Sequence, residues 1–137
     1  MGALERLATM VMEMTGKLDA LADMGLRGWV EELAALHALQ IQAQALLDMI
    51  MRIASRLGYA PETPSEAARL LADEGLITRE ELELVRRVIG FRNIVVHEYT
   101  AVDINLVKRI LEERAYRRLA TLAAKLLEEA KRKNLDP

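Results

Sequence analysis

Residues 29–57 read WVEELAALHALQIQAQALLDMIMRIASRL, and this stretch decides the fold. Apolar side chains recur along it at alternating spacings of three and four residues, which is the period of one helix face. This seam comprises Leu36, Leu39, Ala43, Leu46, Ile50, Ile53 and Leu57. We therefore predict one long helix from about Trp29 to Leu57, and Gly58 is well placed to end it.

A second stripe of this helix is polar in its middle. It comprises Val30, Leu33, His37, Gln40, Gln44, Leu47 and Met51. Glutamine side chains carry donors and acceptors that need partners when they are covered. The stripe therefore predicts a wet groove or a hydrogen-bonded interface beside this helix.

Four further segments carry helical signals. Apolar periodicity predicts a first helix over about residues 4–24. Capping boxes at Thr63–Glu66 and Thr78–Glu81 open a short helix that ends at Gly75 and the helix that follows it. Asp103 is suited to cap a last helix over about residues 104–131.

No linker or strand-like alternation interrupts these helices. We predict an all-α fold in one domain, residues 1–137, built as an up-and-down bundle of four long helices and one short helix. The apolar seams are wide for one small bundle, so we expect a homodimer.

The composition narrows the classes of function. The formal net charge is −2 and the pI about 5.8, so contact with nucleic acid would need a local basic patch. Arg109, Arg114, Arg117 and Arg118 are its first candidates, although they are most simply a solvated helix face. The absence of cysteine fits a reducing cytoplasm, and we expect no signal peptide and no membrane span.

The octapeptide RNIVVHEY, residues 92–99, holds one of the two histidines and lies where a helical pattern is about to end. On a helical wheel of about 100° per residue, Arg92 falls at the centre of an apolar arc. An unpaired charge is costly to bury, so Arg92 needs a carboxylate, a phosphate or a water-filled interface. Glu31, Glu32 and Asp48 are possible ion-pair partners within the chain.

The opposite side of this helix carries Arg86, Gly90, Asn93 and His97 at spacings of four, three and four residues. Gly90 leaves room for a ligand or another backbone, and Asn93 and His97 can share a hydrogen bond or a ligand. Arg92 and His97 diverge by about 140° on a straight helix, so one ligand meets both only near the helix end or across a two-fold interface. A histidine there can also simply favour the helix dipole.

Several kinds of site have no support in the sequence. It lacks a glycine-rich phosphate loop, a His-Glu-x-x-His pair and a serine or cysteine nucleophile motif. Two histidines without clustered carboxylates do not favour a metal site, and we predict no cofactor. The remaining histidine, His37, is expected to be solvated or satisfied in the core.

The segments Phe91–Asn93 and His97–Tyr99 resemble the Arg-x4-His-x-Tyr motif of HepT-type proteins, which are HEPN-domain toxins. The similarity extends over about residues 30–125, including Ala45–Asp48, Pro61–Thr63 and Val102–Asp103. It implies a HEPN-like bundle that dimerises, with two motifs facing each other in a cleft. It also implies a metal-independent RNA endonuclease, partnered by a minimal nucleotidyltransferase antitoxin that transfers AMP to Tyr99.

The residues of the motif suit that chemistry. His97 can exchange a proton near neutral pH, while Arg92 can hold the phosphate and stabilise charge in the transition state. Asn93 would orient His97 or the phosphate. An AMP adduct on Tyr99 would block the cleft. Two alternatives remain open: a non-catalytic, nucleotide-binding partner subunit of a nucleotidyltransferase, which the acidic pI favours, and a purely structural dimer.

Overall fold

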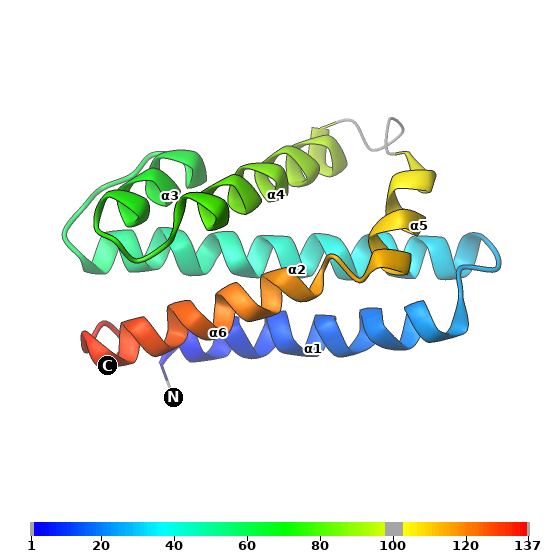
Figure 1. Ribbon diagram of the computed structural model, residues 1–137, viewed down its shortest axis with the longest axis horizontal. Helices are drawn as coiled ribbons and strands as arrows, with labels where there is room; N and C mark the ends of the chain where they lie inside the picture. The colour runs from blue at the N-terminus through cyan, green and yellow to red at the C-terminus, as the bar shows by residue number, and fades with distance from the viewer. Residues whose placement is uncertain (1, 98–102, 137) are drawn as a thin grey trace.

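The computed structural model describes residues 2–97 and 103–136 and folds as a bundle of helices (Figure 1). The described residues contain six helices and no strand: α1 (Ala3–Met24), α2 (Trp29–Arg56), α3 (Pro64–Asp73), α4 (Arg79–His97), α5 (Ile104–Glu113) and α6 (Arg117–Arg132). The all-α prediction is confirmed. The prediction of five helices is wrong, because the last helix is divided into α5 and α6.

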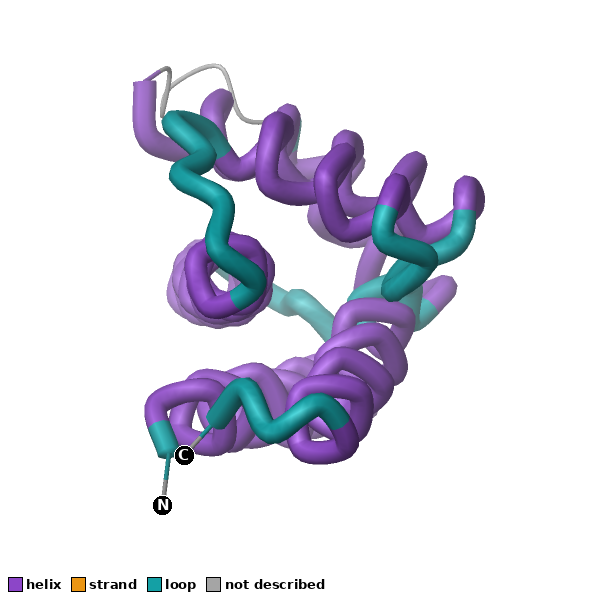
Figure 2. The backbone as a smooth tube through the Cα atoms, turned by 90° about the vertical axis from the view of Figure 1, so that its left-hand side faces the viewer, coloured by secondary structure: helices purple, strands orange, loops and turns teal. Residues whose placement is uncertain are grey.

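Helix α2 runs through the middle of the bundle. Helices α1 and α6 lie on one side of it and α3 and α4 on the other, in both the side view and the end view (Figures 1 and 2). The predicted seam of α2 is buried from Leu36 to Ile53 and contributes to both apolar clusters of the core. By contrast Val30, Leu33 and His37, at the start of the second stripe, are exposed.

By length and composition alone, α2 is the one helix of the described chain that is apolar enough to cross a membrane. Within the bundle, 61% of that window is buried, as in a core helix. Polar residues interrupt α2, so it has no unbroken apolar run of the roughly 18 residues from which the sequence would predict a membrane span.

The helix starts follow the local signals in the sequence. At α4, the backbone N–H of Glu81 donates to Thr78 Oγ1 at 3.1 Å, and that of Thr78 donates to Glu81 Oε1 at 2.7 Å, a reciprocal capping box. Thr63 accepts from the N–H of Glu66 at α3, and Asp103 accepts from that of Asn105 at α5. These predicted caps are confirmed.

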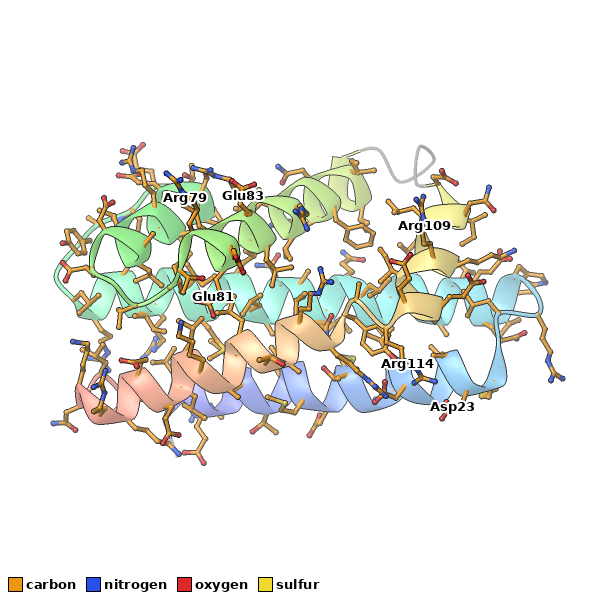
Figure 3. The ribbon with its side chains drawn as sticks, viewed as in Figure 1. Asp23, Arg79, Glu81, Glu83, Arg109 and Arg114 are labelled. Carbon is orange, nitrogen blue, oxygen red and sulfur yellow. The ribbon has the colours of Figure 1, made fainter. Side chains whose placement is uncertain are left out.

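The break between α5 and α6 lies at Arg114, whose backbone is left-handed with φ 54° and ψ 36°. Its guanidinium donates to Asp19 at 3.2 Å and to Asp23 at 2.5 Å, both on α1. Arg114 and Asp23 are labelled in Figure 3. Asp19 also accepts hydrogen bonds from the Tyr116 hydroxyl and from Arg117 Nε. The hydrogen bond from Tyr116, followed by that from Arg117, lowers the pKa of Asp19. Contacts with α1 therefore hold a turn where the local sequence favours continued helix.

The start of α1 is tied to residues near the other end of the described chain. Asp136 accepts from the backbone N–H groups of Leu4 and Glu5, both at 3.0 Å. A carboxylate at this position satisfies two donors that a helix leaves unpaired and opposes the positive end of its dipole. A Cβ added to Gly2 would lie 2.2 Å from that carboxylate, so a larger residue there would displace Asp136 from the cap.

Candidate functional site around Arg92

Helix α4 presents its side chains as the wheel predicts. Val85, Val88 and Val95 are buried, and Arg92 is half-buried between them. On the other side, Arg86, Gly90 and Asn93 are exposed. A Cβ added to Gly90 would meet no atom within 4 Å, so no part of the described chain approaches it closely.

Arg92 is held by a neutral side chain of α2. Its Nε donates to Gln44 Oε1 at 2.9 Å, and Gln44 Nε2 in turn donates to Asp48 Oδ1 at 2.8 Å. The predicted hydrogen-bonded contact of the second α2 stripe is thus formed at Gln44 alone, since no hydrogen bond joins Gln40 to another described residue. The sequence did not identify Gln44 as the partner of Arg92; its only signal was an amide side chain among apolar positions of one helix stripe.

The positive charge of Arg92 is not neutralised within the described chain. None of the carboxylates considered as partners forms an ion pair with it: Glu32 lies 3.7 Å from Lys108 Nζ, and Asp48 accepts from Gln44. The two terminal nitrogens of the guanidinium have no hydrogen-bond acceptor among the described residues. A half-buried cation in this state can bind an anion brought from outside.

His97 is the last residue of α4, one helical turn beyond Asn93. Its side chain and the whole of Tyr99 lie outside the described residues. The meeting of Arg92 with His97, the orientation of Asn93 and the role of Tyr99 therefore stay predictions. No group of three or more His, Cys, Asp or Glu side chains in the described ranges is arranged to hold a metal ion.

Only some of the arginines proposed from the sequence as a basic patch lack an ion-pair partner among the described residues. Arg114 and Arg117 are bound to Asp19. Arg118 is exposed, and no described residue pairs with it. It lines an apolar pocket of about 260 Å³ together with Arg87 of α4 and Gln42 of α2. Phe91, which precedes Arg92, also lines this pocket, but Arg92 itself does not.

Comparison with known proteins identifies the family. The family model described as Ribonuclease HepT-like matches residues 3–126, nearly the whole chain. The chain belongs to this HepT-like family. The family resemblance predicted from the motif around Arg92 is thereby confirmed.

Two curated relatives share part of the sequence. A candidate RNase of Archaeoglobus fulgidus is 29% identical over 84 residues, covering 61% of this chain and 64% of the relative. The mRNA nuclease HepT of Shewanella oneidensis is 29% identical over 76 residues, covering 54% and 56% of the two chains. The alignments thus span less than two thirds of the length of either relative.

Solved structures share the fold at lower sequence identity. A crystal structure of a toxin–antitoxin with AMP-PNP superposes with a TM-score of 0.77 at 16% identity, covering 90% of this chain and 99% of that one. A tri-AMPylated Shewanella oneidensis HEPN toxin in complex with MNT antitoxin gives 0.76 at 17% identity, covering 89% and 97%. The bundle is therefore HEPN-like.

Proposed function

We propose that this protein is a cytoplasmic toxin that cleaves RNA without a metal ion, at a site completed by a second copy of the chain. The observation that carries the proposal is the state of Arg92: a half-buried guanidinium held by a neutral amide, with no described residue bound to its terminal nitrogens. A phosphodiester supplies the anion that this cation lacks. Membership of the HepT-like family and the names of the two curated relatives support RNA as the substrate.

The proposed reaction is a transfer within the RNA. His97 accepts the proton of a ribose 2′-hydroxyl, and the 2′-oxygen forms a bond to the adjacent phosphorus. The bond from phosphorus to the 5′-oxygen breaks, and this oxygen takes a proton from the His97 of the second copy. The products are a 2′,3′-cyclic phosphate and a free 5′-hydroxyl. Arg92 stabilises the charge that develops on the phosphate, and Asn93 orients His97 or the phosphate.

A second copy explains two features of the surface. Val30 and Leu33 are 56% and 45% exposed on the α2 stripe that also carries Gln44, so this stripe offers apolar surface at its start. The open space at Gly90 leaves room for another chain on α4. A two-fold contact over these residues would bring two copies of the motif together.

The proposed partner is a minimal nucleotidyltransferase antitoxin that transfers AMP to Tyr99. Support comes from the two superposed structures, one of which is a toxin–antitoxin with AMP-PNP and the other an AMPylated toxin in complex with MNT antitoxin. The adduct would add a bulky anion two residues after His97 and so exclude RNA. Intact mass before and after incubation with the antitoxin and ATP, for wild type and Tyr99→Phe, tests this transfer.

The test of the activity is cleavage of transfer RNA and messenger RNA by protein purified without antitoxin, in the presence of EDTA. We expect wild type to cleave and to leave cyclic phosphate ends, and His97→Ala and Arg92→Ala to be inert. His37→Ala is the matched control, because His37 is the other histidine and is exposed on α2. Equal activity, or equal inertness, of wild type and His97→Ala contradicts the proposal; inert protein that binds a nucleotidyltransferase favours the partner-subunit alternative.

The need for a second copy is tested separately. Leu33→Glu should give a folded monomer that no longer cleaves, as measured by sedimentation and circular dichroism. Met12→Glu changes a side chain of similar exposure, 40%, on α1 and should leave both the dimer and the activity intact. Full activity of a monomeric Leu33→Glu protein contradicts a composite site.

A further inference from the structure

We infer that Gln44 is a positioning residue for Arg92: it orients the guanidinium for a phosphate without neutralising it, and Asp48 orients Gln44. This inference rests on the proposed function for its link to RNA cleavage. The orientation of Arg92 itself can be tested whether or not the protein cleaves RNA.

Arg92 is held through a single donor of its guanidinium. A guanidinium is planar and has five N–H donors, and the bond to Gln44 uses only the one on Nε. Fixing Nε and the plane leaves the two terminal nitrogens as a parallel pair of donors. Such a pair matches two oxygens of a phosphate in a bidentate contact.

The acceptor for Arg92 Nε is uncharged. A carboxylate at residue 44 would also accept from Nε, but it would form an ion pair with Arg92 and compete with an incoming phosphate. The amide oxygen of Gln44 carries no net charge, so it holds the side chain and leaves the full positive charge for the ligand. A neutral acceptor is therefore the chemistry that a phosphate-binding arginine needs here.

Asp48 lies one helical turn after Gln44 and accepts a hydrogen bond from it. An amide can turn over and present its NH2 group in place of its oxygen, and that orientation would face Arg92 with a donor. Asp48 accepts from Nε2 at 2.8 Å and thereby selects the orientation in which Oε1 faces Arg92. Asp48 is exposed and Gln44 half-buried, so the carboxylate acts from the solvent side of the pair.

The direct test is the NMR signal of the Arg92 Nε–H group. In wild type, a hydrogen-bonded Nε–H should exchange slowly with water, and addition of inorganic phosphate should shift its resonance. Gln44→Leu should speed this exchange more than tenfold. Gln44→Glu should keep slow exchange but weaken the response to phosphate several-fold, because the carboxylate holds the charge.

Asp48→Asn separates the charge of this residue from its hydrogen bond, since an amide oxygen can still accept from Gln44. We expect it to retain slow exchange and Asp48→Ala to lose part of it. Gln40→Leu is the matched control: Gln40 is half-buried one turn earlier on α2 and has no hydrogen-bond partner among the described residues. Unchanged Arg92 exchange in Gln44→Leu, or an equal change in Gln40→Leu, overturns the inference.

Cleavage kinetics provide a second test of the role of Gln44. The loss of one charge-assisted bond in a half-buried place should lower kcat/KM for RNA by about tenfold in Gln44→Leu. Gln44→Glu should chiefly raise KM, because it competes with the phosphate. Normal cleavage by Gln44→Leu with a mobile Arg92 overturns the positioning role while leaving the proposed function standing. If wild type does not cleave RNA, the proposed function fails and the exchange and phosphate measurements alone decide the inference.

Discussion

Arg114 allows a sharp test of the break between α5 and α6. We consider two substitutions, Arg114→Gly and Arg114→Ala, which remove the same ion pairs to Asp19 and Asp23. They differ only in what the backbone at this position tolerates. Glycine adopts φ 54° without steric cost, whereas alanine there costs roughly 1 kcal/mol or more.

The expected magnitudes follow from the geometry. The Arg114 side chain is 29% exposed, and its partners Asp19 and Asp23 are 33% and 71% exposed. Ion pairs with this exposure contribute about 0.2–1 kcal/mol each, so losing both costs about 1 kcal/mol. Arg114→Ala should lose that amount, while Arg114→Gly recovers about 1 kcal/mol from relieved backbone strain and stays near wild type.

The measurement is the free energy of unfolding in urea, followed by circular dichroism, with a thermal melt as support. The glycine variant should be more stable than the alanine variant by about 1 kcal/mol, or about 4 °C in Tm. Within a continuous helix the order reverses, since alanine is about 1 kcal/mol better than glycine. Arg109→Gly and Arg109→Ala, in the interior of α5, supply that reversed order as a control. An alanine variant more stable than the glycine variant at residue 114 would refute the helix break.

Three further outcomes are expected. Asp136→Ala removes the cap of α1 and should lower the free energy of unfolding by about 1–2 kcal/mol; a gain or no change in urea unfolding contradicts the cap. Gly2→Ala should lower the free energy of unfolding to a similar extent, because its Cβ displaces Asp136. The double variant should be little less stable than either single variant, and additive losses in the same assay would show that the two changes act independently. The pKa of Asp19 is lowered by the Tyr116 hydroxyl and by Arg117. The ionised carboxylate of Asp19 therefore stabilises the fold above about pH 4, and this stabilisation is lost as the pH falls through the folded-state pKa. Stability measured against pH should therefore fall less steeply on the acid side in Asp19→Asn than in wild type, and identical curves would contradict this linkage.

The helix starts were predictable because their signals are local. Thr78 and Glu81 lie three residues apart, and each satisfies a backbone donor of the other, so four consecutive residues contain the whole interaction. The buried seam of α2 was predictable for a similar reason, since one periodic face reports which side meets the core. The family followed from the spacing of Arg92, His97 and Tyr99.

The break at Arg114 was not predictable from its neighbours. No glycine or proline interrupts residues 104–131, and the local pattern favours continued helix. The turn depends on Asp19 and Tyr116, which lie 97 residues apart in sequence and meet only when α1 and α6 have packed. The bond between Gln44 and Arg92 spans 48 residues and escaped prediction for the same reason.

The cap of α1 has a consequence for the order of folding. Asp136 follows Leu4 by 132 residues, so a ribosome releases α1 and α2 long before the carboxylate that caps α1 exists. The two helices can pair early through their apolar faces, but the first turn of α1 keeps its free N–H groups until residue 136 has emerged. The nascent chain should therefore gain protection of these amide groups last, although α1 is made before the other five described helices.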